Sequence, residues 1–140
     1  LFEGENPDHT ATTVDAVIDI DGTLSFVHPD CREGDDSQRT SAATYWFGYA
    51  KNENLKLWEA ASPLSYVSKT TPPTLFLNSS VPWMHAGRED YINVLNKYGI
   101  YSEVHEFDGA PHSFCLFDPW FEPTVSYIDG FLKKVFAHTK

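Results

Sequence analysis

The feature that most constrains this chain is an alternation of short apolar runs with amphipathic stretches over its second half. Residues 74–78 (TLFLN) form an apolar run typical of a strand covered on both faces. Residues 86–98 carry apolar side chains at helical spacing and are followed by Gly99, a residue type favoured just after helices. Residues 101–107 (YSEVHEF) alternate as a strand does, and residues 122–137 again show helical spacing. This alternation predicts a parallel sheet with crossover connections.

The first half of the chain adds one strand and a less regular segment. Residues 14–20 (VDAVIDI) have the pattern of a buried strand that Asp21-Gly22 stops. At about residues 28–70 the apolar side chains follow no single periodicity. Two short helical pieces are predicted within residues 41–60. The predicted fold class is α/β, a parallel sheet with flanking helices. We expect the first strand at an unpaired edge, as at the end of a larger domain.

Charge and composition exclude several classes of function. The 140 residues include 20 acidic and 10 basic side chains, a formal net charge of −10. This balance argues against nucleic acid and anionic membranes as partners, because their phosphates would be repelled. No apolar run approaches the roughly 20 residues that a membrane-spanning helix needs. Aromatic residues make up 15% of the chain, a content that disordered acidic tails lack.

The cysteines leave the compartment open. Cys31 and Cys115 are too few for a disulfide scaffold, and their spacing fits no zinc module. One bridge between them would imply an oxidising compartment, and two free thiols agree with the sequence equally well. The chain starts at Leu1 and shows no signal-peptide pattern, features that a mature secreted protein and a fragment would share. A secreted or periplasmic location is the favoured expectation.

The end of the first predicted strand carries a short motif with a chemical interpretation. Residues 16–24 (AVIDIDGTL) place Asp-x-Asp-Gly-Thr after an apolar strand and so resemble the first motif of haloacid-dehalogenase phosphatases. That resemblance implies Asp19 as a nucleophile at phosphorus and Asp21 as an acid/base, with Mg²⁺ between them. Such chemistry also needs later carboxylates beside the metal, and residues 106–109 (EFDG) do not have that form. A turn alone would explain a strand that ends in Asp-Gly.

A histidine follows the last predicted strand. His112 lies within residues 109–114 (GAPHSF), a short distance after the strand at 101–107. Ligands of open parallel sheets bind outside the carboxyl ends of the strands, so this histidine is well placed to act as a general base. For a lone histidine, a loop side chain with one backbone hydrogen bond would be the simpler explanation.

Several further motifs, in one order, carry a resemblance to a known family. The matching stretches are residues 58–64 (WEAASPL), 72–77 (PPTLFL), 97–100 (KYGI), 109–114 (GAPHSF) and 131–132 (FL). In this order and spacing, most of the chain resembles the C-terminal part of an α/β-hydrolase. The resemblance is greatest to the esterase branch related to hormone-sensitive lipase and to bacterial carbohydrate and feruloyl esterases.

The resemblance implies a carboxylic-ester hydrolase with His112 as the histidine of a catalytic triad. Residues 1–140 would form the C-terminal portion of one α/β-hydrolase domain, with a cap-like helical insert at about 28–70. The implied substrate is a small-molecule or polysaccharide ester, and no metal or organic cofactor is implied. The nucleophile motif Gly-x-Ser-x-Gly lies upstream in such enzymes and is absent from this sequence. We therefore expect the chain to need the N-terminal portion of the same enzyme and to be inactive alone.

The acid of the triad is the residue on which the sequence departs from the resemblance. These enzymes usually carry a Gly-Asp-x-Asp turn after the penultimate strand, where this chain has residues 78–82 (NSSVP). Some α/β-hydrolases take the acid from the preceding strand, which favours Asp21 first and Asp19 second. Glu89 and Asp90 are further candidates, although carboxylates in a first helical turn also favour the helix dipole. The alternative functions are a Mg²⁺-dependent phosphatase that uses Asp19 and Asp21, and a non-catalytic α/β module.

Overall fold

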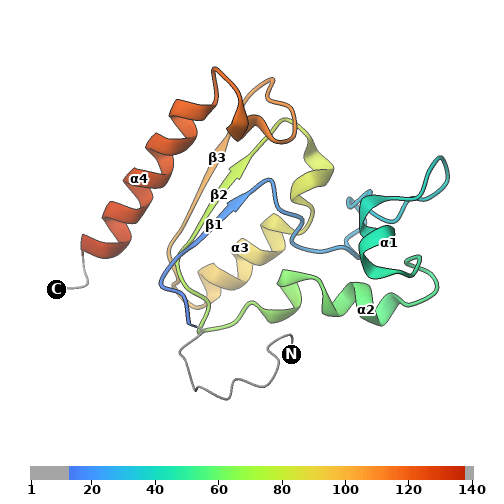
Figure 1. Cartoon of the computed structure of the whole chain (residues 1–140). Coiled ribbons are helices and arrows are strands. Elements are labelled where there is room, and N and C mark those ends of the chain that lie inside the picture. Colours follow the sequence, from blue (N-terminus) through green and yellow to red (C-terminus); the bar gives the residue numbers. More distant parts are fainter. Residues whose placement is uncertain (1–12, 138–140) are drawn as a thin grey trace, which may run out of the picture.

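The computed structural model describes residues 13–137, which form a parallel sheet with a helix on each face (Figure 1). The strands are β1 (Val17–Ile20), β2 (Thr74–Asn78) and β3 (Ser102–Glu106). Strand β2 lies in the middle and pairs in parallel with both neighbours, so that Ile20, Leu77 and His105 are aligned across the sheet. The predicted α/β class, with a parallel sheet and flanking helices, is confirmed.

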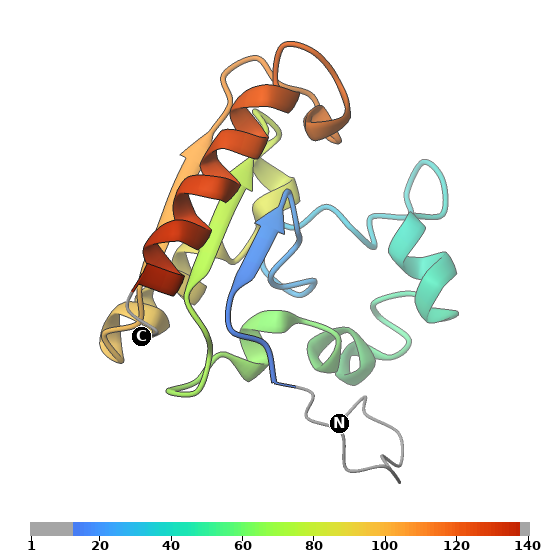
Figure 2. The ribbon, with the colours of Figure 1, turned by 60° about the vertical axis from the view of Figure 1, so that its left-hand side comes forward.

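Two helices cover opposite faces of this sheet (Figures 1 and 2). They are α3 (Arg88–Lys97) and α4 (Phe121–Ala137). On the α3 side, Phe76 of β2 packs with Leu95, and on the α4 side Leu77 packs with Phe131. Every residue of β2 is buried, as the uninterrupted apolar run predicted for a strand covered on both faces.

The segment between β1 and β2, which we call the insert, carries two short helices within residues 41–60, as the sequence predicted. Its helices are α1 (Ala42–Phe47) and α2 (Leu55–Ala60), followed by the 3-10 turn η1 (Pro63–Tyr66). Trp58 of α2 is fully buried, and its ring meets Phe26 and Phe47 edge-on at centroid distances of 6.1 and 4.7 Å. These rings give the insert a small aromatic core beside the sheet. Its role as a cap stays a prediction.

The first strand differs from its prediction in length and burial. It covers only Val17–Ile20 rather than residues 14–20, because this part alone pairs with β2, and Val14 is 61% exposed. The prediction of a buried strand is wrong for β1, which is at most half-buried. It does lie at an edge of the sheet formed by residues 13–137, as expected.

The structure also describes two features that bear on the cellular location of the protein, the state of its cysteines and the character of its helices. Cys31 is buried and Cys115 is half-buried, and both are free thiols in this structure. No helix within the described part of the chain combines the length and apolar character that crossing a membrane requires. Residues 1–12 and 138–140 of the predicted 1–140 domain lie outside the described residues.

Candidate active site

Asp21 lies at the carboxyl end of β1, in the turn by which the chain leaves the sheet. Its backbone φ of 55° is left-handed, a region that Asp and Asn enter more readily than other residues with a side chain. Its N–H donates to the carbonyl of Leu77 at 2.9 Å, and the N–H of Ser79 donates to Oδ1 of Asp21 at 2.8 Å. The carboxylate is therefore buried and held by the neighbouring strand end.

His112 lies in the loop between β3 and α4, and its ring meets the Asp21 carboxylate. Nδ1 of His112 is 3.0 Å from Oδ2 of Asp21, across a separation of 91 residues in the chain. The Asp21 side chain is 1% exposed, whereas the His112 side chain is 52% exposed. One nitrogen of the ring thus contacts a buried carboxylate, and Nε2 has no protein partner among residues 13–137.

The loop that carries His112 is fixed to the loop that follows β2. The N–H of Ser80 donates to the carbonyl of Ala110 at 3.0 Å, and Oγ of Ser80 donates to the carbonyl of Phe107 at 2.9 Å. Phe114, two residues after His112, is fully buried in the core under α4. His112 therefore belongs to a loop that is held at both ends, which limits how far the ring can move from Asp21.

A buried carboxylate on Nδ1 has a defined chemical consequence for the imidazole. It favours the tautomer with hydrogen on Nδ1, which leaves the Nε2 lone pair free to accept a proton. It also stabilises the imidazolium that forms when Nε2 takes that proton. The pair is therefore suited to general-base catalysis next to a nucleophile placed at Nε2.

The structure does not bring the other three candidate acids to His112. Asp19 instead accepts a hydrogen bond from the N–H of Gly22. Glu89 binds Arg88 at 2.8 Å. Asp90 lies 3.6 Å from Nε2 of His28.

Asp19 is nonetheless unusual for a carboxyl group. Burial raises its pKa to about 7, and the negative charge of Asp21 adds to this rise. Its Oδ2 is buried and has no hydrogen-bond partner among residues 13–137. A carboxyl in such surroundings holds its proton much more tightly than an ordinary aspartate does.

Arg88 joins the ends of β2 and β3 next to this site. Its Nη1 donates to Oδ1 of Asn78 and to Oε1 of Glu106, both at 2.7 Å, and its side chain is only 11% exposed. A guanidinium held by two partners on neighbouring strands ties these strand ends together.

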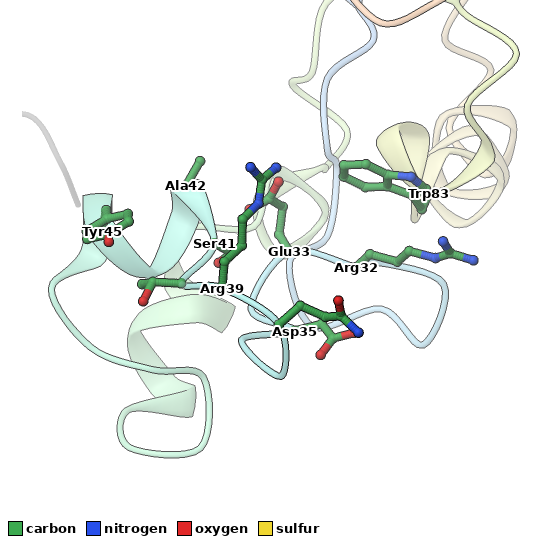
Figure 3. Close-up of a pocket in the computed structure, with 10 residues that line it drawn as sticks. Arg32, Glu33, Asp35, Arg39, Ser41, Ala42, Tyr45 and Trp83 are labelled. Carbon is green, nitrogen blue, oxygen red and sulfur yellow. The ribbon is translucent and has the colours of Figure 1, made fainter.

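A cavity of about 600 Å³ opens between the insert and the loop after β2 (Figure 3). Arg39 and Tyr45 line it from the insert, and Trp83 lines it from η2 (Pro82–His85). A second cavity of about 570 Å³ shares Arg32 and Trp83 and extends to Ser80, the neighbour of the residue that binds Asp21. The two cavities therefore lead from the carboxyl edge of the sheet toward the insert.

Sequence reasoning missed two contributors to this site. The N–H of Ser79 donates a hydrogen bond to Asp21. Such a backbone donor cannot be recognised in the sequence, because almost every residue type has a backbone N–H. Trp83 lines both cavities, and no local pattern distinguishes it from a packing residue.

Comparison with known proteins identifies the family. The model of the BD-FAE family matches residues 2–81, which include Asp21 and the insert. The chain belongs to the BD-FAE family. This is an esterase family, so the phosphatase interpretation of Asp19 and Asp21 is wrong. No curated protein matches the chain.

Solved structures show that this BD-FAE chain has the fold of part of an α/β-hydrolase esterase. It is similar to native Est2, a thermophilic esterase of Thermogutta terrifontis, with a TM-score of 0.61 and 22% identity, covering 96% of this chain and 47% of that one. Est2 with bound butyrate gives a TM-score of 0.62 at 21% identity, covering 96% and 49%. A truncated carbohydrate esterase from gut microbiota gives 0.63 at 20% identity, covering 90% and 44%. The chain spans about half the length of these esterases.

Proposed function

We propose that this chain supplies the histidine and the acid of a serine carboxylesterase. His112 is the general base, and Asp21 orients its ring and stabilises the imidazolium. The observation that carries the proposal is the 3.0 Å contact between Nδ1 of His112 and Oδ2 of Asp21, at the carboxyl edge of a parallel sheet. Membership of an esterase family supports the same chemistry.

The nucleophilic serine comes from outside the 140 residues. No Gly-x-Ser-x-Gly occurs in the sequence, and the chain spans about half the length of the solved esterases. We therefore propose the N-terminal portion of the same enzyme as the partner that completes the triad. The 140 residues alone are expected to be inactive.

The reaction follows from the geometry of the ring. Nε2 of His112 takes the proton of the serine as its Oγ attacks the ester carbonyl, and then gives this proton to the leaving alcohol. Water attacks the acyl-enzyme in the same way, and the released serine recovers its proton from Nε2. In both steps the positive charge on the ring forms beside the buried Asp21 carboxylate, whose negative charge attracts it.

The substrate class is proposed as an ester of a carbohydrate alcohol with a short acyl group. Est2 structures contain bound butyrate and propionate, and another similar structure is a carbohydrate esterase. The cavities that share Arg32 and Trp83 offer an aromatic ring and hydrogen-bonding side chains to the alcohol portion (Figure 3). A small-molecule ester without a sugar is the second candidate for this site.

The test uses the protein expressed from its complete gene, assayed on p-nitrophenyl acetate and on an acetylated oligosaccharide. His112→Ala and Asp21→Asn are each expected to lower kcat by about 10³- to 10⁴-fold, because each removes a member of one catalytic unit. Glu89→Gln and Asp90→Asn, which alter the rival acids, are the matched controls and are expected to keep kcat. Full activity in the His112 or Asp21 variant would contradict the proposal. Complete inactivity of the unaltered protein toward all esters would instead favour a non-catalytic module.

A further inference from the structure

Asp19 lies two residues before Asp21, on the face of β1 that α3 covers. It is aligned with Phe76 of β2, whose ring packs against Tyr91 of α3 at a centroid distance of 5.8 Å. Aligned residues on neighbouring strands point to the same face of a sheet. The mutual electrostatic influence between Asp19 and both Arg88 and Tyr91 of α3 agrees with this placement.

The carboxyl group of Asp19 touches the backbone of the turn that follows β1. The N–H of Gly22 donates a hydrogen bond to it. A Cβ at Gly22 would overlap Oδ1 of Asp19, and the three atoms nearest to that Cβ position all belong to Asp19. Any larger residue at position 22 would therefore have to displace the Asp19 carboxyl group, and the backbone of Gly22 is not left-handed.

This contact lies directly after the strained residue of the proposed triad. Asp21 has a left-handed backbone that is unfavourable for a residue with a Cβ, so it must be held by its surroundings. On the sheet side, its N–H binds the carbonyl of Leu77. On the other side, the next peptide N–H, that of Gly22, binds Asp19. The two contacts together fix the peptide units on either side of Asp21.

The protonation of Asp19 is compatible with this task. Burial raises its pKa to about 7, opposed by the hydrogen bond from Gly22, aided by the charge of Asp21 and opposed by that of Arg88. A protonated carboxyl still offers its carbonyl oxygen to Gly22, and it keeps a second negative charge away from the carboxylate that faces His112. The buried Oδ2, without a hydrogen-bond partner in the described part of the chain, agrees with this form.

We propose that Asp19 is a positioning residue for the proposed triad: it holds the N–H of Gly22 and thereby the turn that directs Asp21 toward His112. The inference rests on the proposed function where activity is the readout. The orientation of Asp21 toward His112 can also be measured without an activity assay.

The experiment compares Asp19→Asn with Asp19→Ala in the protein expressed from its complete gene. Asn keeps an oxygen acceptor for Gly22, so Asp19→Asn is expected to keep kcat within about threefold. Asp19→Ala loses the acceptor and is expected to lower kcat about tenfold or more with an unchanged KM. The reason is that the lost hydrogen bond orients a catalytic group and makes no contact with substrate. Asp15→Ala, an exposed carboxylate just before β1, is the matched control and is expected to leave both constants unchanged.

Gly22→Ala gives a second and independent test of the same contact. Alone it forces a methyl group against Asp19 and is expected to lower kcat as Asp19→Ala does. In the Asp19→Ala background the methyl group has room, so Gly22→Ala is expected to add no further loss. This non-additivity is the signature of a direct contact between the two residues.

Proton NMR of the His112 ring separates failure of this inference from failure of the proposed function. The ring N–H bonded to Asp21 is expected to give a low-field resonance in the unaltered protein and in Asp19→Asn, and a shifted or broadened one in Asp19→Ala. Full kcat in Asp19→Ala, an equal loss in Asp19→Asn, or an unchanged resonance in folded Asp19→Ala would each overturn the inference. The proposed function separately requires that His112→Ala lose activity. The resonance tests the role of Asp19 whether or not His112→Ala is inactive.

Discussion

The backbone N–H of Ser79 and the carboxylate of Asp21 form a hydrogen bond of 2.8 Å that joins the ends of two neighbouring strands. One oxygen of the carboxylate thus accepts from the residue that follows β2, and the other faces Nδ1 of His112 at 3.0 Å. A single buried side chain thus connects the ends of β1 and β2 with the loop that follows β3.

Removing the donor of Ser79 is expected to weaken both the fold and the proposed activity. Ser79→Pro deletes the N–H that binds Asp21, and a charge-assisted hydrogen bond of this kind contributes about 1.5–3 kcal/mol. Urea unfolding should report a loss of that order in the free energy of unfolding, together with a lower kcat. Ser79→Ala keeps the N–H and serves as the control, with a smaller effect. Equal effects of the two variants would show that the donor is unimportant.

The stability of the protein is expected to depend on pH through Asp19. Its folded-state pKa is raised from 3.8 to about 7, chiefly by burial, so the folded protein binds its proton more tightly than the unfolded chain. The free energy of unfolding therefore loses this contribution as the pH rises from about 4 to about 7, and is constant in this respect above 7. Asp19→Asn removes the dependence, so its stability relative to the unaltered protein should increase over that window. Urea unfolding at pH 4, 5.5 and 8 measures the difference, and a constant difference would contradict the prediction.

Shortening Trp83 is expected to affect large substrates selectively. Trp83 lines both cavities beyond the carboxyl edge of the sheet, so Trp83→Ala should raise KM for an acetylated oligosaccharide several-fold. KM for p-nitrophenyl acetate should change little, because this ester has no sugar chain to occupy the cavities. Trp46→Ala is the matched control, since Trp46 is 75% exposed and does not line either cavity. An equal rise of KM for both esters would argue against an alcohol-binding role for the cavities.

The 140-residue chain produced alone is expected to self-associate. Among residues 13–137, β1 pairs with β2 on one side only, and an unpaired strand edge offers its peptide groups to another chain. Ile20 is 37% exposed at this edge, so Ile20→Lys should reduce the association. Light scattering after size-exclusion chromatography measures the mass in solution. A stable monomer of the unaltered chain would disprove the prediction.

Much of the fold could be predicted because the elements around β2 are marked locally. The centre of β2 is apolar on both faces, with Leu75, Phe76 and Leu77 in succession, and residues 86–98 and 122–137 repeat apolar side chains at the helical period. These patterns reflect burial of whole faces, which involves many residues at once. The extent of β1 was less predictable, because an edge strand is defined by the pairing it makes and only Val17–Ile20 pairs with β2.

For the site, the sequence by itself determined which residues had the right chemistry and at which strand ends they stood: His112 after β3, and Asp21 or Asp19 at the end of β1. Only the tertiary structure shows which of these carboxylates meets the His112 ring. The parallel pairing of β1 and β2 brings the N–H of Ser79 to Asp21, and the loop that follows β3 brings His112 to the same carboxylate. The physical reason is the sharp turn: side chains two positions apart on a strand point to the same face, but the left-handed backbone of Asp21, just past the end of β1, gives its carboxylate different surroundings from that of Asp19. Asp21 turns toward His112, while Asp19 points under the turn to Gly22. Contacts across 91 residues are set by the sheet and its loops, and no local pattern of residue types records them.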